Sequence, residues 1–164
     1  RRSTLLHHAV GHYHKVLARA YYQQANYDMA LLLNDMASNI REEDSEIRNT
    51  MGLTYLQLGD EVLASEQFNK ARELDAGNLQ ANLNLGLMAL GSGDYQLAAE
   101  CFNAVIVVYP GNVDAHLGLA VAYRGIADFE SAIAEYDTIL AVDPCERRAL
   151  DARNWKNMLF PWKE

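Results

Sequence analysis

The pattern of small, aromatic and polar positions along the chain repeats every 34 residues. A Gly-Asp or Ala-Asp pair recurs at this interval, followed by an alanine and then by a large ring. Repetition at such a period is the signature of an array of supersecondary units. The pairs are Gly59-Asp60, Gly93-Asp94 and Ala127-Asp128, the alanines are Ala30, Ala64, Ala98 and Ala132, and the rings are Phe68, Phe102 and Tyr136.

The Gly-Asp pairs predict two helices in each unit. Glycine supplies the positive φ at which a helix ends, and aspartate caps the N-terminus of the next helix. Apolar residues at helical spacing fill the stretches on either side. The predicted helices span residues 11–24, 27–41, 45–58, 61–75, 79–92, 95–109, 113–126 and 129–142, with the first extended back toward Thr4 and a ninth, capping helix at about 146–159.

At these positions the chain resembles a tetratricopeptide-repeat protein with units at 11–44, 45–78, 79–112 and 113–146. The family places a small residue eighth in the unit, met by Ala18, Gly52, Gly86 and Ala120. The unit closes on proline, met by Pro110 and Pro144 but not by Glu42 and Ala76, and Asn34 replaces the aromatic residue of the first unit. The resemblance implies an all-α, right-handed superhelix of antiparallel helix pairs, forming a single domain over residues 1–164.

The resemblance also implies a binding groove, lined by the first helix of every unit at its second, fifth, ninth and twelfth places. The second place holds His12, Glu46, Gln80 and Asp114, and the predicted groove residues at the other places are Lys15, Arg19, Tyr22, Asn49, Leu53, Leu56, Leu83, Leu87, Leu90, Leu117, Val121 and Arg124. Seven of these are aliphatic, and an exposed apolar stripe typically marks an interaction site. We therefore expect a partner helix or extended apolar segment there. The alternative is that some of these leucines pack in the core, as aliphatic residues at helical spacing usually do.

Charge and composition limit the classes of partner that the chain is expected to bind. The chain has 14 Lys and Arg against 22 Asp and Glu, a net charge of -8, which disfavours nucleic acid. The sequence contains no apolar run long enough for a membrane span, and Cys101 and Cys145 are expected to be free thiols. His8 and His12 lie one turn apart but supply only half of a zinc site. No nucleophile, phosphate-loop or metalloprotease motif occurs, so we expect no catalysis, no cofactor and no metal.

The sequence thus predicts a non-catalytic protein–protein interaction module, an assembly factor or scaffold of a larger complex. The resemblance extends to bacterial envelope proteins that assist pilus, secretion or motility machines, which implies a periplasmic, lipid-anchored full-length form. The start at Arg1-Arg2-Ser3 suggests a processed or trimmed product. The alternatives are a cytoplasmic scaffold or regulatory domain of a larger protein, and self-association in which the groove accepts a neighbour's terminal segment, Trp155 to Trp162.

Overall fold

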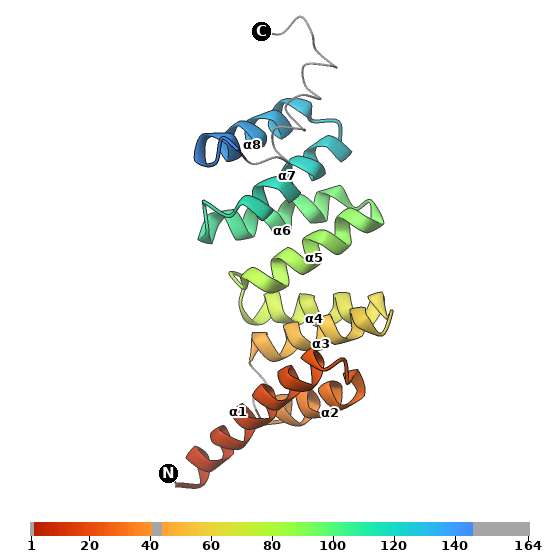
Figure 1. Cartoon of the computed structure of the whole chain (residues 1–164), viewed down its shortest axis with the longest axis vertical. Helices are drawn as coiled ribbons and strands as arrows, with labels where there is room; N and C mark the ends of the chain where they lie inside the picture. Colours follow the sequence, from red (N-terminus) through yellow and green to blue (C-terminus); the bar gives the residue numbers. More distant parts are fainter. Residues whose placement is uncertain (1, 41–43, 146–164) are drawn as a thin grey trace, which may run out of the picture. The chain divides into compact units, whose positions relative to one another are not determined.

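The computed structural model describes residues 2–40 and 44–145, which form eight α-helices and no strand (Figure 1). The predicted capping helix at 146–159 and the segment from Trp155 to Trp162 lie outside the described residues. The helices are α1 (Arg2–Gln23), α2 (Tyr27–Ser38), α3 (Ser45–Gln57), α4 (Glu61–Leu74), α5 (Leu79–Ser92), α6 (Tyr95–Val108), α7 (Val113–Gly125) and α8 (Phe129–Val142).

Side-chain caps fix where the helices begin. Every helix from α2 to α8 begins at the predicted residue, and α1 extends toward the N-terminus as expected. At each of these starts the preceding Asp or Asn accepts a hydrogen bond from a backbone N–H of the first turn, which satisfies a donor that has no partner within the helix. The capping residues are Asn26, Asp44, Asp60, Asn78, Asp94, Asn112 and Asp128.

The turns within the helix pairs use one backbone conformation at four equivalent positions. Gly59 and Gly93 have φ of +81° and +79°, which glycine adopts without steric cost. Ala25 and Ala127 occupy the same place in the first and fourth repeats with φ of +58° and +62°. The repeat therefore imposes the turn even at alanine, whose Cβ atom makes the left-handed conformation unfavourable.

Contacts between Cα atoms divide the chain into two compact units, Arg1–Ala81 and Asn82–Glu164. In the first unit α1 packs against α2, α2 against α3, and α3 against α4. Its core is built on small residues and one large ring: Ala18, Ala30, Ala37, Ile47, Ala64 and Phe68 are fully buried. The small residues let helix backbones approach closely, and the ring fills the space between them.

In the second unit α7 packs against both α6 and α8. Phe102 of α6 is buried and lies against two glycines, Gly86 of α5 and Gly118 of α7. A second cluster, between α7 and α8, contains Ala120 and Tyr136. The predicted small and aromatic positions therefore form the core of each unit.

Candidate partner-binding site

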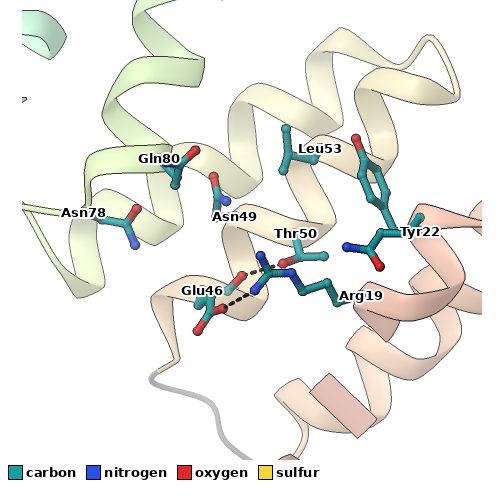
Figure 2. A pocket seen from close by; sticks show the side chains of 9 residues that line it. Arg19, Tyr22, Glu46, Asn49, Thr50, Leu53, Asn78 and Gln80 are labelled. Atoms are coloured by element: carbon teal, nitrogen blue, oxygen red, sulfur yellow. Dashed lines mark hydrogen bonds and ion pairs between the residues drawn. The ribbon is translucent and has the colours of Figure 1, made fainter. Parts of the chain in front are cut away.

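In the first unit, α1, α3 and the start of α5 surround an open pocket of about 520 Å³ (Figure 2). Four of the predicted groove residues line it: Arg19, Tyr22, Asn49 and Leu53. The remaining lining residues are Gln23, Glu46, Thr50, Asn78 and Gln80. Of these, Glu46 and Gln80 occupy the second place of their repeats, which the resemblance assigns to the groove wall.

Ion pairs tie α1 to α3 at one side of this pocket. The Lys15 ammonium lies 3.0 Å from an Asp44 carboxylate oxygen and also contacts Glu46, while the Arg19 guanidinium lies 3.6 Å from Glu46. Lys15 is mostly buried and lies outside the pocket lining, whereas the Arg19 side chain is 68% exposed. Lys15 therefore stabilises the α1–α3 contact, and Arg19 is the cation that a ligand can reach.

Polar side chains dominate the pocket wall. Thr50 donates to the Glu46 carbonyl at 2.9 Å, an interaction within α3 that leaves the hydroxyl oxygen toward the pocket (Figure 2). Asn78 donates to the Ser45 hydroxyl at 2.9 Å and accepts from the Ala81 N–H. Asn49 is buried, while Gln80 is exposed. Seven of the nine residues that line this pocket are therefore polar, and four of these seven carry carboxamides.

Tyr22 and Leu53 supply the apolar surface of the pocket. The rings of Tyr22 and Tyr27 lie 5.8 Å apart at 58°, so the two tyrosines support each other. Burial raises the pKa of the Tyr22 hydroxyl, with Tyr27 adding to the effect and a hydrogen bond from Gln57 opposing it. A tyrosine hydroxyl is already protonated at neutral pH, so Tyr22 can act as a hydrogen-bond donor. Leu56 is half-buried and does not line the pocket.

The second unit carries the other six predicted groove residues, Leu83, Leu87 and Leu90 on α5 and Leu117, Val121 and Arg124 on α7. Leu87 is 59% and Val121 41% exposed, and Arg124 is exposed as well. Leu83, Leu90 and Leu117 are half-buried, and Leu117 packs against the buried cluster of Ala120 and Tyr136. None of the seven predicted aliphatic side chains is fully buried, although Leu117 contributes to the core.

Sequence reasoning did not assign Gln23, Thr50 and Asn78 to the site. Asn78 caps α5, a role that the sequence indicated. Its position beside the pocket could not be predicted, because it depends on how the connection between α4 and α5 packs against α3. Across residues 2–40 and 44–145, no helix has the length and apolar character of a membrane span. Within the same residues, no three His, Cys, Asp or Glu side chains gather as a metal site would require.

Antiparallel helix pairs repeated in a constant register, with polar and apolar side chains presented by the first helix of each pair, define an α-helical repeat protein of the solenoid class. Such proteins are non-catalytic modules whose surfaces bind other proteins. The sequence model of the tetratricopeptide repeat matches residues 49–104 and 83–144. The chain belongs to the tetratricopeptide-repeat family.

Solved structures share this fold. The MamA RS-1 ArsTM double mutant aligns with a TM-score of 0.81 and 22% identity, over 91% of this chain and 84% of that one. MamA 41-end from Desulfovibrio magneticus RS-1 gives a TM-score of 0.80 at 22% identity, over 91% and 84% of the two chains. YrrB, a TPR protein with an unusual peptide-binding site, gives 0.71 at 23% identity, over 84% and 71%. No curated protein matches the chain. These similarities show an all-α tetratricopeptide-repeat solenoid.

Proposed function

We propose that the chain binds an extended segment of a partner protein in the pocket between α1 and α3. The observation that carries this proposal is the composition of the pocket wall, in which two exposed carboxamides, Gln23 and Gln80, line the same pocket as Leu53 and Tyr22. Carboxamides can donate to and accept from a peptide group at the same time. A leucine and a tyrosine give an adjoining side chain an apolar contact.

Arg19 adds a preference for a negatively charged residue in that segment. Its guanidinium is exposed and lies 3.6 Å from Glu46, a separation longer than that of a tight charge-assisted hydrogen bond. A partner carboxylate can therefore compete for Arg19 at little cost, because exposed ion pairs are weak. The YrrB structure supports the proposal, since a similar fold there carries a peptide-binding site.

We extend the proposal to the second unit, where the exposed side chains of Leu87 and Val121 offer a partner protein an apolar contact. The resemblance assigns large apolar side chains on the first helix of each repeat to partner recognition. A partner helix or extended apolar segment would cover them and remove their surface from water.

The biological role that we propose is that of an assembly factor or scaffold in a larger complex, such as a bacterial pilus, secretion or motility machine. The support for this role is the resemblance noted from the sequence, and it implies an envelope address. The alternative is a cytoplasmic scaffold or regulatory domain of a larger protein. A lipobox cysteine upstream in the full-length gene would favour the envelope role, and its absence would favour the alternative.

A phage-displayed library of random peptides tests the binding site. We expect selected peptides to bind the wild-type chain and to lose binding to the Leu53→Asp and Arg19→Glu variants. Leu32→Asp is the matched control, because Leu32 is exposed on α2 outside the pocket. All variants should keep the wild-type helical circular dichroism. Peptides that bind Leu53→Asp as well as wild type would place the site elsewhere, and loss of helicity in Leu53→Asp would assign Leu53 to the core.

A pull-down with the wild type and the Leu53→Asp, Leu87→Asp double variant extends this test to natural partners. Captured proteins that depend on both leucines would be identified by mass spectrometry. Capture that is unchanged in the double variant would contradict a role for these two side chains.

A further inference from the structure

Glu46 of α3 divides its carboxylate between two cations of α1. Its Oε1 lies 3.6 Å from the Arg19 guanidinium, and its Oε2 contacts the Lys15 ammonium. Glu46 and Arg19 both line the pocket, and both side chains are more than half exposed (Figure 2). Lys15 is mostly buried and lies outside the pocket lining. One ion pair of Glu46 therefore belongs to the pocket wall, and the other does not.

The Lys15 contact holds Glu46 independently of Arg19. Lys15 also lies 3.0 Å from an oxygen of Asp44, whose side chain is only 8% exposed. Asp44 in turn accepts a hydrogen bond from the Glu46 backbone N–H at the start of α3. The Arg19 contact is looser, because 3.6 Å exceeds the length of about 2.7–2.9 Å of a charge-assisted hydrogen bond. Arg19 can therefore move away while the Glu46 carboxylate keeps a cation beside it.

The charge of the pocket wall resides in this one pair. Of the nine residues that line the pocket, Arg19 and Glu46 are the charged ones. They are ninth in the first repeat and second in the next, and the same two places one repeat later hold Leu53 and Gln80, which line the pocket without charge. The pair of Arg19 and Glu46 therefore decides how the pocket wall responds to a charged group.

We propose that Glu46 sets the charge preference of the pocket, an inference that rests on the proposed peptide site. In the free chain its carboxylate occupies the place beside Arg19 that a carboxylate of the partner segment takes on binding. The partner segment then carries an Asp or Glu side chain at this point. Arg19 exchanges one carboxylate for another, and Glu46 keeps its contact with Lys15. Because one exposed ion pair is lost for the one gained, Glu46 keeps the preference for an acidic residue small.

Peptide libraries selected separately on the wild type and on Glu46→Gln test this role. We expect acidic residues in both selections, with stronger enrichment on Glu46→Gln, because the competing carboxylate is gone. An acidic peptide and its carboxamide counterpart are then synthesised with blocked termini, so that they differ in one side-chain charge. In isothermal titration calorimetry Glu46→Gln should bind the acidic peptide about two- to fivefold more tightly than wild type, which is the size of an exposed ion pair. It should bind the carboxamide peptide as wild type does.

Glu61→Gln is the matched control. Glu61 is an exposed carboxylate in the first turn of α4 and does not line the pocket. The variant loses the same charge at the same place in a helix, and both peptides should bind it as they bind wild type. Helical circular dichroism should be unchanged in Glu46→Gln as well, because Lys15 keeps its ion pair with Asp44.

The Arg19→Gln background separates competition from simple repulsion. Repulsion between Glu46 and an acidic peptide does not need Arg19, whereas competition for a cation does. We therefore expect Glu46→Gln to bring no gain in affinity when Arg19 is replaced.

Three results would overturn the role of Glu46 while the peptide site stands, which is shown by loss of binding in Leu53→Asp. They are a gain that persists without Arg19, a Glu46→Gln chain with wild-type affinity for the acidic peptide, and selections without acidic residues. Peptides that bind Leu53→Asp as well as wild type would instead contradict the peptide site itself.

Discussion

Gly52 of α3 lies directly against the ring of Phe68 of α4. A Cβ atom at Gly52 would stand 2.6 Å from Cε1 of the ring, a separation that real Cβ atoms do not reach. Phe68 is fully buried, so the ring has no room to move away. The missing side chain at Gly52 and the Phe68 ring, the largest side chain in the core of the first unit, are therefore two parts of one contact.

We predict that Gly52→Ala lowers the free energy of unfolding by about 1–3 kcal/mol, the usual cost of overpacking a core. Gly91→Ala is the matched control, because Gly91 is also helical but nothing lies within 4 Å of its added Cβ. Alanine there should stabilise the chain by about 0.5–1 kcal/mol through its higher helix propensity. Urea denaturation followed by circular dichroism measures both effects. Equal effects of the two substitutions would contradict the Gly52–Phe68 contact.

Local chemistry explains why the helices could be predicted from the sequence. A capping residue such as Asp60 or Asp94 accepts a hydrogen bond from a backbone N–H three residues further along the chain. Both groups of this hydrogen bond are therefore close in sequence, and the local pattern of residues is enough to predict it. The small residue at Gly52 and the ring at Phe68 could also be predicted, because the repeat fixes which positions face each other. Helix starts and core positions therefore needed no information on distant contacts.

The composition of the pocket could be predicted only in part. The resemblance assigned Arg19 and Leu53 to the groove wall, and both residues line the pocket. It did not show that Lys15 is held by Asp44, because that ion pair depends on the path of the chain between α2 and α3. Nor did it show that Leu117 packs partly into the core, since the orientation of α7 against α8 decides how far that side chain is covered. Contacts between elements, not properties of a single helix, set these differences.

His116 of α7 links two elements of the second unit, and this polar contact is open to test. Its Nδ1 lies 2.6 Å from a Glu135 carboxylate oxygen and its Nε2 lies 2.8 Å from the Pro110 carbonyl oxygen. Both partners are acceptors, so the ring donates to both when it carries two protons. His116 is buried, which makes the loss of a partner costly.

We predict that Glu135→Ala lowers the free energy of unfolding by about 1–3 kcal/mol, because a buried ring nitrogen then lacks its partner. Glu135→Gln should cost less, since its amide can donate to Nδ1 of the neutral ring. Glu73→Ala, at an exposed position of α4, is the control and should change little. Chemical denaturation compares the three variants. If Glu135→Ala proved as harmless as Glu73→Ala, the contact would contribute nothing to stability.

The hydrogen bonds to the Asp128 carboxylate make the stability of the α8 N-terminus depend on pH. A hydrogen bond from the Ser131 hydroxyl at 2.7 Å, and a second from the Ser131 backbone N–H, hold the pKa of the Asp128 carboxyl below its ordinary value. Because the folded-state pKa is depressed, the stabilisation is complete above the unfolded-state pKa. It is lost as the pH falls through the lower, folded-state pKa. Acid should therefore weaken this cap.

We predict that Ser131→Ala raises the pKa of Asp128 toward its ordinary value, because the strongest hydrogen bond to the carboxylate is removed. Ser131→Thr keeps a hydroxyl and is the matched control, in which the pKa should stay low. Carboxyl-carbon chemical shifts followed by NMR across the acid range report the titration directly. A pKa that is the same in Ser131→Ala and wild type would show that the hydroxyl is not the cause.

Asn34 of α2 replaces the aromatic residue of the repeat and is fully buried. Among the described residues, neither its Nδ2 nor its Oδ1 has a hydrogen-bond partner. A buried amide without partners costs free energy, and an apolar side chain of similar shape removes that cost. We predict that Asn34→Leu raises the free energy of unfolding by about 1–3 kcal/mol. Asn103→Leu, at an exposed position of α6, should leave it nearly unchanged. Thermal and urea denaturation would measure both, and a loss of stability in Asn34→Leu would mean that the amide has an unrecognised polar partner.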